Sequence, residues 1–135
     1  MATTLVDSSV LLDIITEDPT WFHWSFDALT VAADAGPLVI NPIVYAEVSV
    51  RFSMIEELDE ALPTSDFVRS PLPWPSAFLA AKAFTRYRRR GGARSSPMPD
   101  FFIGAHAAID GHRLLTRDRV RVSGYFPTVE LISPA

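Results

Sequence analysis

The sequence predicts an α/β fold, a three-layer α/β/α sandwich with a mainly parallel central sheet, and two observations lead to this class. First, short β-prone runs alternate along the chain with longer segments of helical periodicity. Because a strand, helix and strand in succession join parallel strands, this alternation places helices on both faces of one sheet. Second, acidic residues directly follow two of the predicted strands, where parallel α/β folds form their sites. With 135 residues and 48% hydrophobic content, the chain suits a single domain over residues 1–135.

The first third of the chain contains two predicted strands and two predicted helices. Residues 3–6 form a β-prone run that ends at Asp7, and residues 8–15 then show a helical pattern. An Asp-Pro pair predicts the start of a second helix, over residues 18–36, because aspartate caps helices and proline suits their first position. Residues 38–40 follow as a brief apolar strand.

Two further helices are predicted in the next part of the chain. Residues 43–52 are apolar on most sides, with Glu47 in the middle of the segment. Ser53 and Glu56 have the spacing of a capping box, which predicts a separate helix over residues 54–62.

Prolines interrupt the following segment and leave room for only a short strand, around residues 67–68. A helix over residues 76–90 then ends in a run of arginines before two glycines. The last elements are a helix from Asp100 to Gly111, a strand over 113–116, a turn-rich stretch over 117–127 and a strand over 129–132.

Four acidic residues stand out by position: Asp7, Glu47, Asp100 and Asp118. Taken singly, Asp7 and Asp100 could be helix caps and Asp118 could start a turn. Glu47 lies among valines, where a buried carboxylate is costly unless it is paired, and an ion pair with Arg51 one turn later is the simplest alternative. If all four meet, their mutual repulsion favours a hard divalent cation bound by oxygens, Mg²⁺ or Mn²⁺.

Composition and charge narrow the possible functions. The chain has no cysteine, which excludes disulfides, thiolate nucleophiles and thiolate metal sites. It also has no apolar run of membrane-spanning length and no signal-peptide pattern, so we expect a cytoplasmic protein without membrane association. The net charge of −4 hides a division, because residues 67–99 hold seven bases and no acid. This local patch permits an RNA partner, with the following candidate contacts: Arg86, Arg88, Arg89, Arg90 and Arg94.

The ordered set of these segments resembles the PIN domain, and specifically the VapC-like toxins of bacterial type II toxin–antitoxin systems. The resemblance covers essentially the whole chain and is carried by Leu5-Val6-Asp7-Ser8-Ser9, by Glu47 within a helix, by Asp100 to Ala107, and by Leu114-Leu115-Thr116-Arg117-Asp118. A small departure is Gly104, which stands where alanine is frequent in such proteins.

This resemblance implies a Mg²⁺- or Mn²⁺-dependent endoribonuclease that forms a homodimer and is inhibited by a cognate antitoxin. It also implies that Asp7, Glu47, Asp100 and Asp118 are the catalytic and metal-binding acids, supported by Thr116 and Ser9. Trp21 and Trp24 lie one turn apart and would form an exposed groove for an antitoxin helix, if they are not core residues.

Two other functions remain compatible with the predicted fold. One is a Mg²⁺-dependent phosphoryl-transfer enzyme, but a haloacid-dehalogenase-like site expects a second aspartate where Ser9 stands, and the only lysine, Lys82, lies in a predicted helix. The other is a non-catalytic RNA-binding module of the same fold, which the presence of all four acids disfavours. His23, His106 and His112 show no paired spacing, so we expect structural or exposed histidines.

Overall fold

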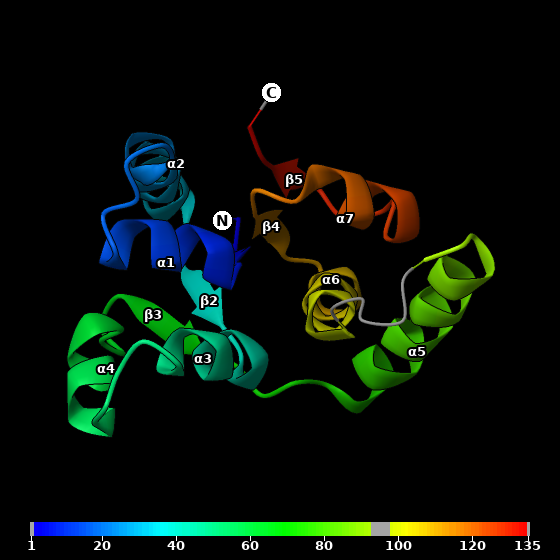
Figure 1. The fold of residues 1–135 in the computed structure, drawn as a ribbon, viewed down its shortest axis with the longest axis horizontal. Coiled ribbons are helices and arrows are strands. Elements are labelled where there is room, and N and C mark those ends of the chain that lie inside the picture. The colour runs from blue at the N-terminus through cyan, green and yellow to red at the C-terminus, as the bar shows by residue number, and fades with distance from the viewer. Residues whose placement is uncertain (1, 93–97, 135) are drawn as a thin grey trace.

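The computed structural model describes residues 2–92 and 98–134, in which five short strands form one sheet in the order β3-β2-β1-β4-β5 (Figure 1). All four pairs of neighbouring strands are parallel. The strands are β1 (Thr4–Val6), β2 (Leu38–Ile40), β3 (Phe67–Arg69), β4 (Arg113–Leu115) and β5 (Leu131–Ile132). The helices are α1 (Ser8–Ile15), α2 (Phe22–Ala35), α3 (Pro42–Ser49), α4 (Ile55–Ala61), α5 (Trp74–Arg89), α6 (Met98–Asp110) and α7 (Arg119–Tyr125).

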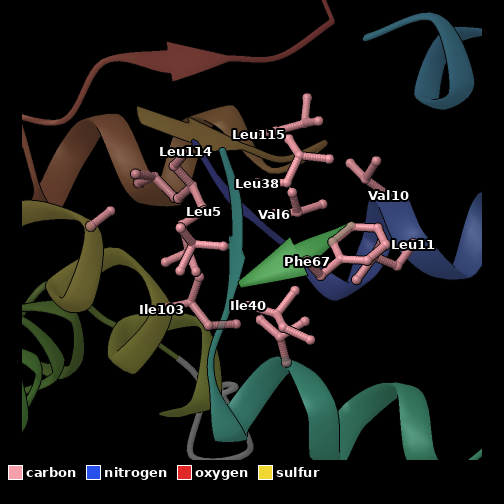
Figure 2. Close-up of a cluster of buried hydrophobic side chains, with 14 of the residues drawn as sticks. Leu5, Val6, Val10, Leu11, Leu38, Ile40, Phe67, Ile103, Leu114 and Leu115 are labelled. Carbon is pink, nitrogen blue, oxygen red and sulfur yellow. The ribbon is translucent and has the colours of Figure 1, made fainter. Parts of the chain in front are cut away.

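Helices cover both sides of this sheet, which confirms the predicted three-layer α/β/α sandwich. Helix α1 packs against α2 and α3, while α5 packs against α6 (Figure 1). The core lies between the sheet and these helices, and Figure 2 shows β1 and β4 residues meeting α1 and α6 residues there. Leu5, Val6 and Leu115 are completely buried. Because β1 and β2 are buried along their full length, they lack the polar–apolar alternation of half-exposed strands.

Parallel pairing places the end of β1 beside the end of β4. The register pairs Val6 with Leu115, so Asp7 and Thr116 emerge side by side at the carboxyl edge of the sheet. This edge is where α/β folds place their binding sites. The prediction that the acids after these two strands share one edge therefore agrees with the topology.

The capping of two helix starts differs from the prediction. Asp18 does cap a turn, since its Oδ1 accepts hydrogen bonds from the N–H groups of Thr20 and Trp21 at 2.9 and 2.8 Å, but α2 begins only at Phe22. The capping box at residues 53–56 is wrong: Met54 occupies the N-cap of α4 and its side chain makes no capping hydrogen bond.

A more substantial difference is α7, which occupies most of the stretch predicted to be turn-rich. Its formation depends on packing against distant parts of the chain, because Val122 and the adjoining Phe126 are buried. The ring of Phe126 lies so close to α6 that a Cβ atom at Gly104 would stand 2.5 Å from its Cδ2 atom. Glycine at position 104 therefore permits this close approach, which accounts for the departure from alanine.

None of the helices within residues 2–92 and 98–134 combines the length and the apolar character needed to cross a bilayer.

Candidate metal centre

Asp7 follows β1 directly and occupies the N-cap position of α1, yet its side chain makes no capping hydrogen bond. Its Oδ2 instead accepts hydrogen bonds from the hydroxyls of Thr116 and Ser9, both at 2.8 Å. The residue is 8% exposed, and burial raises the pKa of the Asp7 carboxyl despite the hydrogen bonds from Thr116 and Ser9, which lower it. The geometry thus argues against a simple helix cap and brings the two predicted supporting residues, Thr116 and Ser9, to this carboxylate.

Asp118 reaches the same place through the end of β4. Its backbone N–H donates to the Thr116 hydroxyl at 3.0 Å, and that hydroxyl donates onward to Asp7. The negative charge of Asp118 is a further cause that raises the pKa of Asp7. Asp118 therefore lies within electrostatic reach of Asp7, as the resemblance implies.

Glu47 comes to the centre on α3, whose start is well defined by sequence. The Asn41 side chain accepts a hydrogen bond from the Val44 N–H at 2.9 Å, and Pro42 occupies the first helical turn. Glu47 Oε1 accepts a hydrogen bond from the Ser8 hydroxyl at 2.8 Å. Burial, followed by the charge of Asp7, raises the pKa of Glu47.

The alternative partner for Glu47 does not engage it. No ion pair joins Glu47 to Arg51 in the described part of the chain. The carboxylate instead points toward the first turn of α1, where Ser8 lies. A Glu47 carboxylate that is hydrogen-bonded by Ser8 and not by Arg51 is consistent with a cation-binding role.

Asp100, in the first turn of α6, completes a group of three carboxylates. One oxygen from each of Asp7, Glu47 and Asp100 lies within 4.8 Å of the other two. Hard divalent cations bind oxygen ligands, and a cation would offset the repulsion and desolvation that raise the pKa values of Asp7 and Glu47. The donor set therefore fits Mg²⁺ or Mn²⁺, and Asp118 lies beside the three-carboxylate group rather than within it.

Asp7, Asp100 and Asp118 line a cleft of about 670 Å³. Acids dominate its lining, but two cations, Arg51 and Arg117, also face it. We did not predict either arginine as a site residue. The signal for Arg51 was present in the sequence, since it is the only base among the first 66 residues.

Asp13 is a third residue of the cleft that the sequence interpretation missed. It is 2% exposed, and its carboxylate binds the Arg117 guanidinium through Nε at 2.8 Å and Nη2 at 3.0 Å. The clue was the same as for Glu47: an acid within an apolar helix, between Leu12 and Ile14.

The predicted RNA-binding arginines that the structure describes lie apart from the cleft lining. Arg86, Arg88 and Arg89 occupy the last turn of α5, Arg90 is its C-cap, and Arg94 lies outside the described residues. Two of them contact Tyr125 near α7: the Arg86 Nη2 donates to its carbonyl oxygen at 3.3 Å, and the Arg90 guanidinium lies 5.1 Å from its ring centroid. None of the arginines described on α5 lines the carboxylate cleft.

Two of the histidines come together although their spacing in the sequence did not indicate it. The ring centroids of His106 and His112 are 5.5 Å apart. Together with the Asp110 carboxylate, the two rings form a group of three side chains that are close enough to hold a metal ion. The Asn41 amide, fixed by its bond to Val44, presents Nδ2 to His106 Nδ1 at 3.0 Å, so Nδ1 is the acceptor and Nε2 carries the proton.

That proton excludes the usual form of metal ligation at His106. The protonated Nε2 donates to Asp110 at 3.0 Å, and a cation bound there would leave the ring without any proton. His106 is completely buried, and burial lowers the pKa values of both His106 and His112. His106 is therefore a neutral imidazole in a hydrogen-bonded network that joins α6 to Asn41 and includes the Asp110 carboxylate.

Trp21 and Trp24 do not form an exposed groove. Both are half-buried, their rings meet edge to face with centroids 6.4 Å apart, and Trp24 packs against the core. The most exposed large apolar side chains of the described residues include Trp74 and Phe78, on α5.

The described fold is shared by solved toxin–antitoxin complexes. A chain of VapBC2 from Rickettsia felis, bound to a DNA fragment from its promoter, has a TM-score of 0.75 at 17% identity, covering 98% of this chain and 99% of that one. A toxin–antitoxin complex from Klebsiella pneumoniae gives 0.70 at 21% identity, with 98% of both chains covered. VapBC-1 from nontypeable Haemophilus influenzae gives 0.71 at 15%, with 97% of both chains covered.

At identities this low, the TM-scores establish a shared fold and nothing more. A comparison with curated proteins found no match. The family itself is shown by the sequence: the model of the PIN domain matches residues 4–122, from the first residue of β1 into α7. That match spans all three carboxylates of the metal group and the Thr116–Asp118 segment. The chain therefore belongs to the PIN domain family.

Proposed function

We propose that residues 1–135 form one PIN domain that acts as a metal-dependent endoribonuclease toxin in the cytoplasm and is neutralised by a cognate antitoxin. The observation that carries the proposal is the convergence of Asp7, Glu47 and Asp100, whose oxygens lie within 4.8 Å of one another beside Asp118. Three carboxylates held this close suit a divalent cation. Nuclease chemistry is the common use of such a site in PIN domains.

Asp7, Glu47 and Asp100 would hold Mg²⁺ or Mn²⁺, with Asp118 as a further acid beside them. The bound ion would supply a water of lowered pKa and stabilise charge that develops on the phosphodiester. Thr116 and Ser9 orient Asp7 by donating to its Oδ2, and Ser8 does the same for Glu47. These hydroxyls hold the carboxylates in place before any cation arrives, which reduces the cost of binding.

The proposed partners follow from other features. The solved relatives that share the fold are toxin–antitoxin complexes, which supports an antitoxin partner for this chain. The exposed Trp74 and Phe78 support association of the chain into a homodimer. Arg86, Arg88, Arg89, Arg90 and Arg94 precede α6 and its Asp100, so they would guide an RNA strand toward the carboxylates.

Cleavage of labelled single-stranded RNA tests the reaction. The purified chain, stripped of metal and resupplied with Mg²⁺ or Mn²⁺, should cut RNA, and EDTA should stop it. Asp7→Asn and Asp100→Asn should both lose cleavage while their circular dichroism stays that of the wild type. Cleavage that survives EDTA, or persists in both variants, would overturn the metal mechanism. RNA binding without cleavage would instead favour the non-catalytic RNA-binding module.

Association is tested separately. Light scattering should report a dimer at micromolar concentration, and a monomer would contradict the homodimer. Sequencing of RNA ends after brief expression, with Asp7→Asn as the control, would identify the RNA that is cut.

A further inference from the structure

Helix α1 is joined to the segment after β4 by a partly buried ion pair. Asp13, on α1, binds the Arg117 guanidinium side-on, with Nε at 2.8 Å from Oδ2 and Nη2 at 3.0 Å from Oδ1. The Ser25 hydroxyl, on α2, donates to the same Oδ2 at 2.7 Å. The Asp13 side chain is 3% exposed, whereas that of Arg117 is 32% exposed and faces the carboxylate cleft.

The ion pair sets the environment of Asp13 in the cleft. Both of its oxygens are engaged by Arg117, and Asp13 does not belong to the three-carboxylate metal group although it lines the same cleft. A buried carboxylate is costly unless it is paired and hydrogen-bonded, and two parallel bonds to one guanidinium satisfy both requirements. The two parallel hydrogen bonds therefore fix the relative orientation of Asp13 and Arg117, and the opposite charges of the two groups compensate each other.

The guanidinium is held on a third side by an aromatic ring. Arg117 Cζ lies 5.2 Å from the ring centroid of Trp21, within the range of a cation–π contact. Trp21 in turn meets Trp24 edge to face. The aromatic pair that the sequence suggested as a binding groove thus serves in part as a support for Arg117.

Arg117 stands between two residues of the metal centre. Thr116 on one side donates to Asp7 Oδ2 at 2.8 Å, and Asp118 on the other donates its N–H to the Thr116 hydroxyl at 3.0 Å. The N–H of Thr116 still pairs with Ile132 in the sheet, but β4 has ended and the chain then turns away. The Arg117 side chain ties this departing segment to α1.

We propose that the Asp13–Arg117 ion pair is a positioning device for the metal centre: it holds the segment that carries Thr116 and Asp118 against Asp7. The assignment rests on the proposed metal-dependent function and extends it to two residues outside the carboxylate group. Without the pair, residues 117–118 would lose this link to α1, so Asp118 and the Thr116 hydroxyl that its N–H binds would be held less firmly beside Asp7. Metal affinity and turnover would both fall, although every carboxylate of the group would remain.

The decisive variant is Asp13→Asn, which keeps the size of the side chain and the bond from Ser25 but removes the charge. Removal of a group that orients a metal ligand typically reduces metal affinity or activity by about 10- to 100-fold. We expect a reduction of this size in Mn²⁺ affinity, measured by titration calorimetry on the metal-free protein, and a fall in kcat for RNA larger than any rise in KM. Trp21 fluorescence should also change in the metal-free protein, because Arg117 would move from its ring.

Arg69→Lys is the matched control. It alters an arginine that pairs with Asp59 at 2.8 Å but lies at β3, away from the cleft, so Mn²⁺ affinity and kcat should stay at wild-type values. Arg117→Lys keeps the charge and removes the side-on double hydrogen bond, so it should give a partial reduction. If Asp13→Asn does not fold by circular dichroism, Arg117→Lys decides the question.

Wild-type Mn²⁺ affinity in a folded Asp13→Asn variant, or in Arg117→Lys if only that variant folds, would overturn the positioning role. A reduced melting temperature with unchanged affinity would mean that the pair only stabilises the fold. Failure of the wild type to cleave RNA would instead refute the proposed function, while the comparison of Mn²⁺ affinities would still decide the role of the pair.

Discussion

Replacing Asp7 with asparagine should stabilise the metal-free protein at neutral pH. Burial raises the pKa of Asp7 above the ordinary value of 3.8, so the folded state holds a proton more tightly than the unfolded state does. Stability that this group contributes in its protonated form is therefore lost as the pH rises through the folded-state pKa. Asparagine carries no charge at any pH and avoids that loss.

The size of the effect follows from linkage. Each unit of pKa elevation is worth about 1.4 kcal/mol once the pH exceeds both pKa values. The amide oxygen of asparagine can still accept hydrogen bonds from the hydroxyls of Thr116 and Ser9, so the substitution need not break either bond. We therefore expect the substitution to raise both the free energy of unfolding and the Tm of the metal-free protein at pH 7.5.

Urea unfolding in EDTA, at several pH values, measures this directly. The advantage of Asp7→Asn should vanish below pH 3.8, where aspartate is protonated in both states, and should grow as the pH rises. Saturating Mn²⁺ should reverse the order, because a ligand at about 100 times its Kd adds about 2.7 kcal/mol to the state that binds it. Asp27→Asn, at an exposed position of α2, serves as the control. A less stable Asp7→Asn protein in EDTA at pH 7.5, or equal stabilisation of both proteins by Mn²⁺, would refute the reasoning.

Three further predictions concern other parts of the molecule. Gly104→Ala should lower the free energy of unfolding in urea by about 1–3 kcal/mol, because its methyl group would press on the Phe126 ring. Gly124→Ala, which has open space around it, should leave that free energy unchanged or raise it. Equal effects of the two substitutions would contradict the close approach of Phe126 to α6. Burial lowers the pKa of His106, so the free energy of unfolding should decline as the pH falls below about 6.5. This decline should be smaller in His106→Gln. Identical pH profiles of unfolding for the two proteins would contradict a neutral His106 in the folded state. Alanine at Arg88, Arg89 and Arg90 should reduce the slope of log RNA affinity against log salt concentration by about 0.7 for each phosphate that the protein no longer neutralises. Asp100→Asn should keep this slope and stop cleavage. An unchanged slope and cleavage rate in the triple variant would mean that RNA binds elsewhere on the protein.

The sequence could predict the parts of the fold that depend on local patterns. The succession of strands and most helices along the chain followed from periodicity, and the placement of Asp7 and Asp118 at one edge followed from parallel strands that end there. The role of Thr116 was implied only by the resemblance. Glu47 was recognisable as an acid among apolar neighbours. Asp13 had the same signature in the sequence, but only its ion pair with Arg117 identifies its role.

The remaining features depend on interactions between distant residues. Helix α7 has seven residues, too few for a clear periodic signal, and it is stabilised by the burial of Val122 and Phe126. The bond between Asn41 and His106 joins positions 65 residues apart, and no local pattern marks either of them as a partner. Such interactions exist only once the tertiary structure has formed.

Asn41 links the two helices that deliver acids to the metal centre. It caps α3, which carries Glu47, and its amide also binds His106 on α6, which carries Asp100. The buried Asn41 thus limits how far the carboxylates of Glu47 and Asp100 can move apart. Because Ca²⁺ takes six to eight oxygens at about 2.3–2.6 Å and Mg²⁺ needs about 2.0–2.1 Å, a braced frame of this kind would discriminate between cations by their radius.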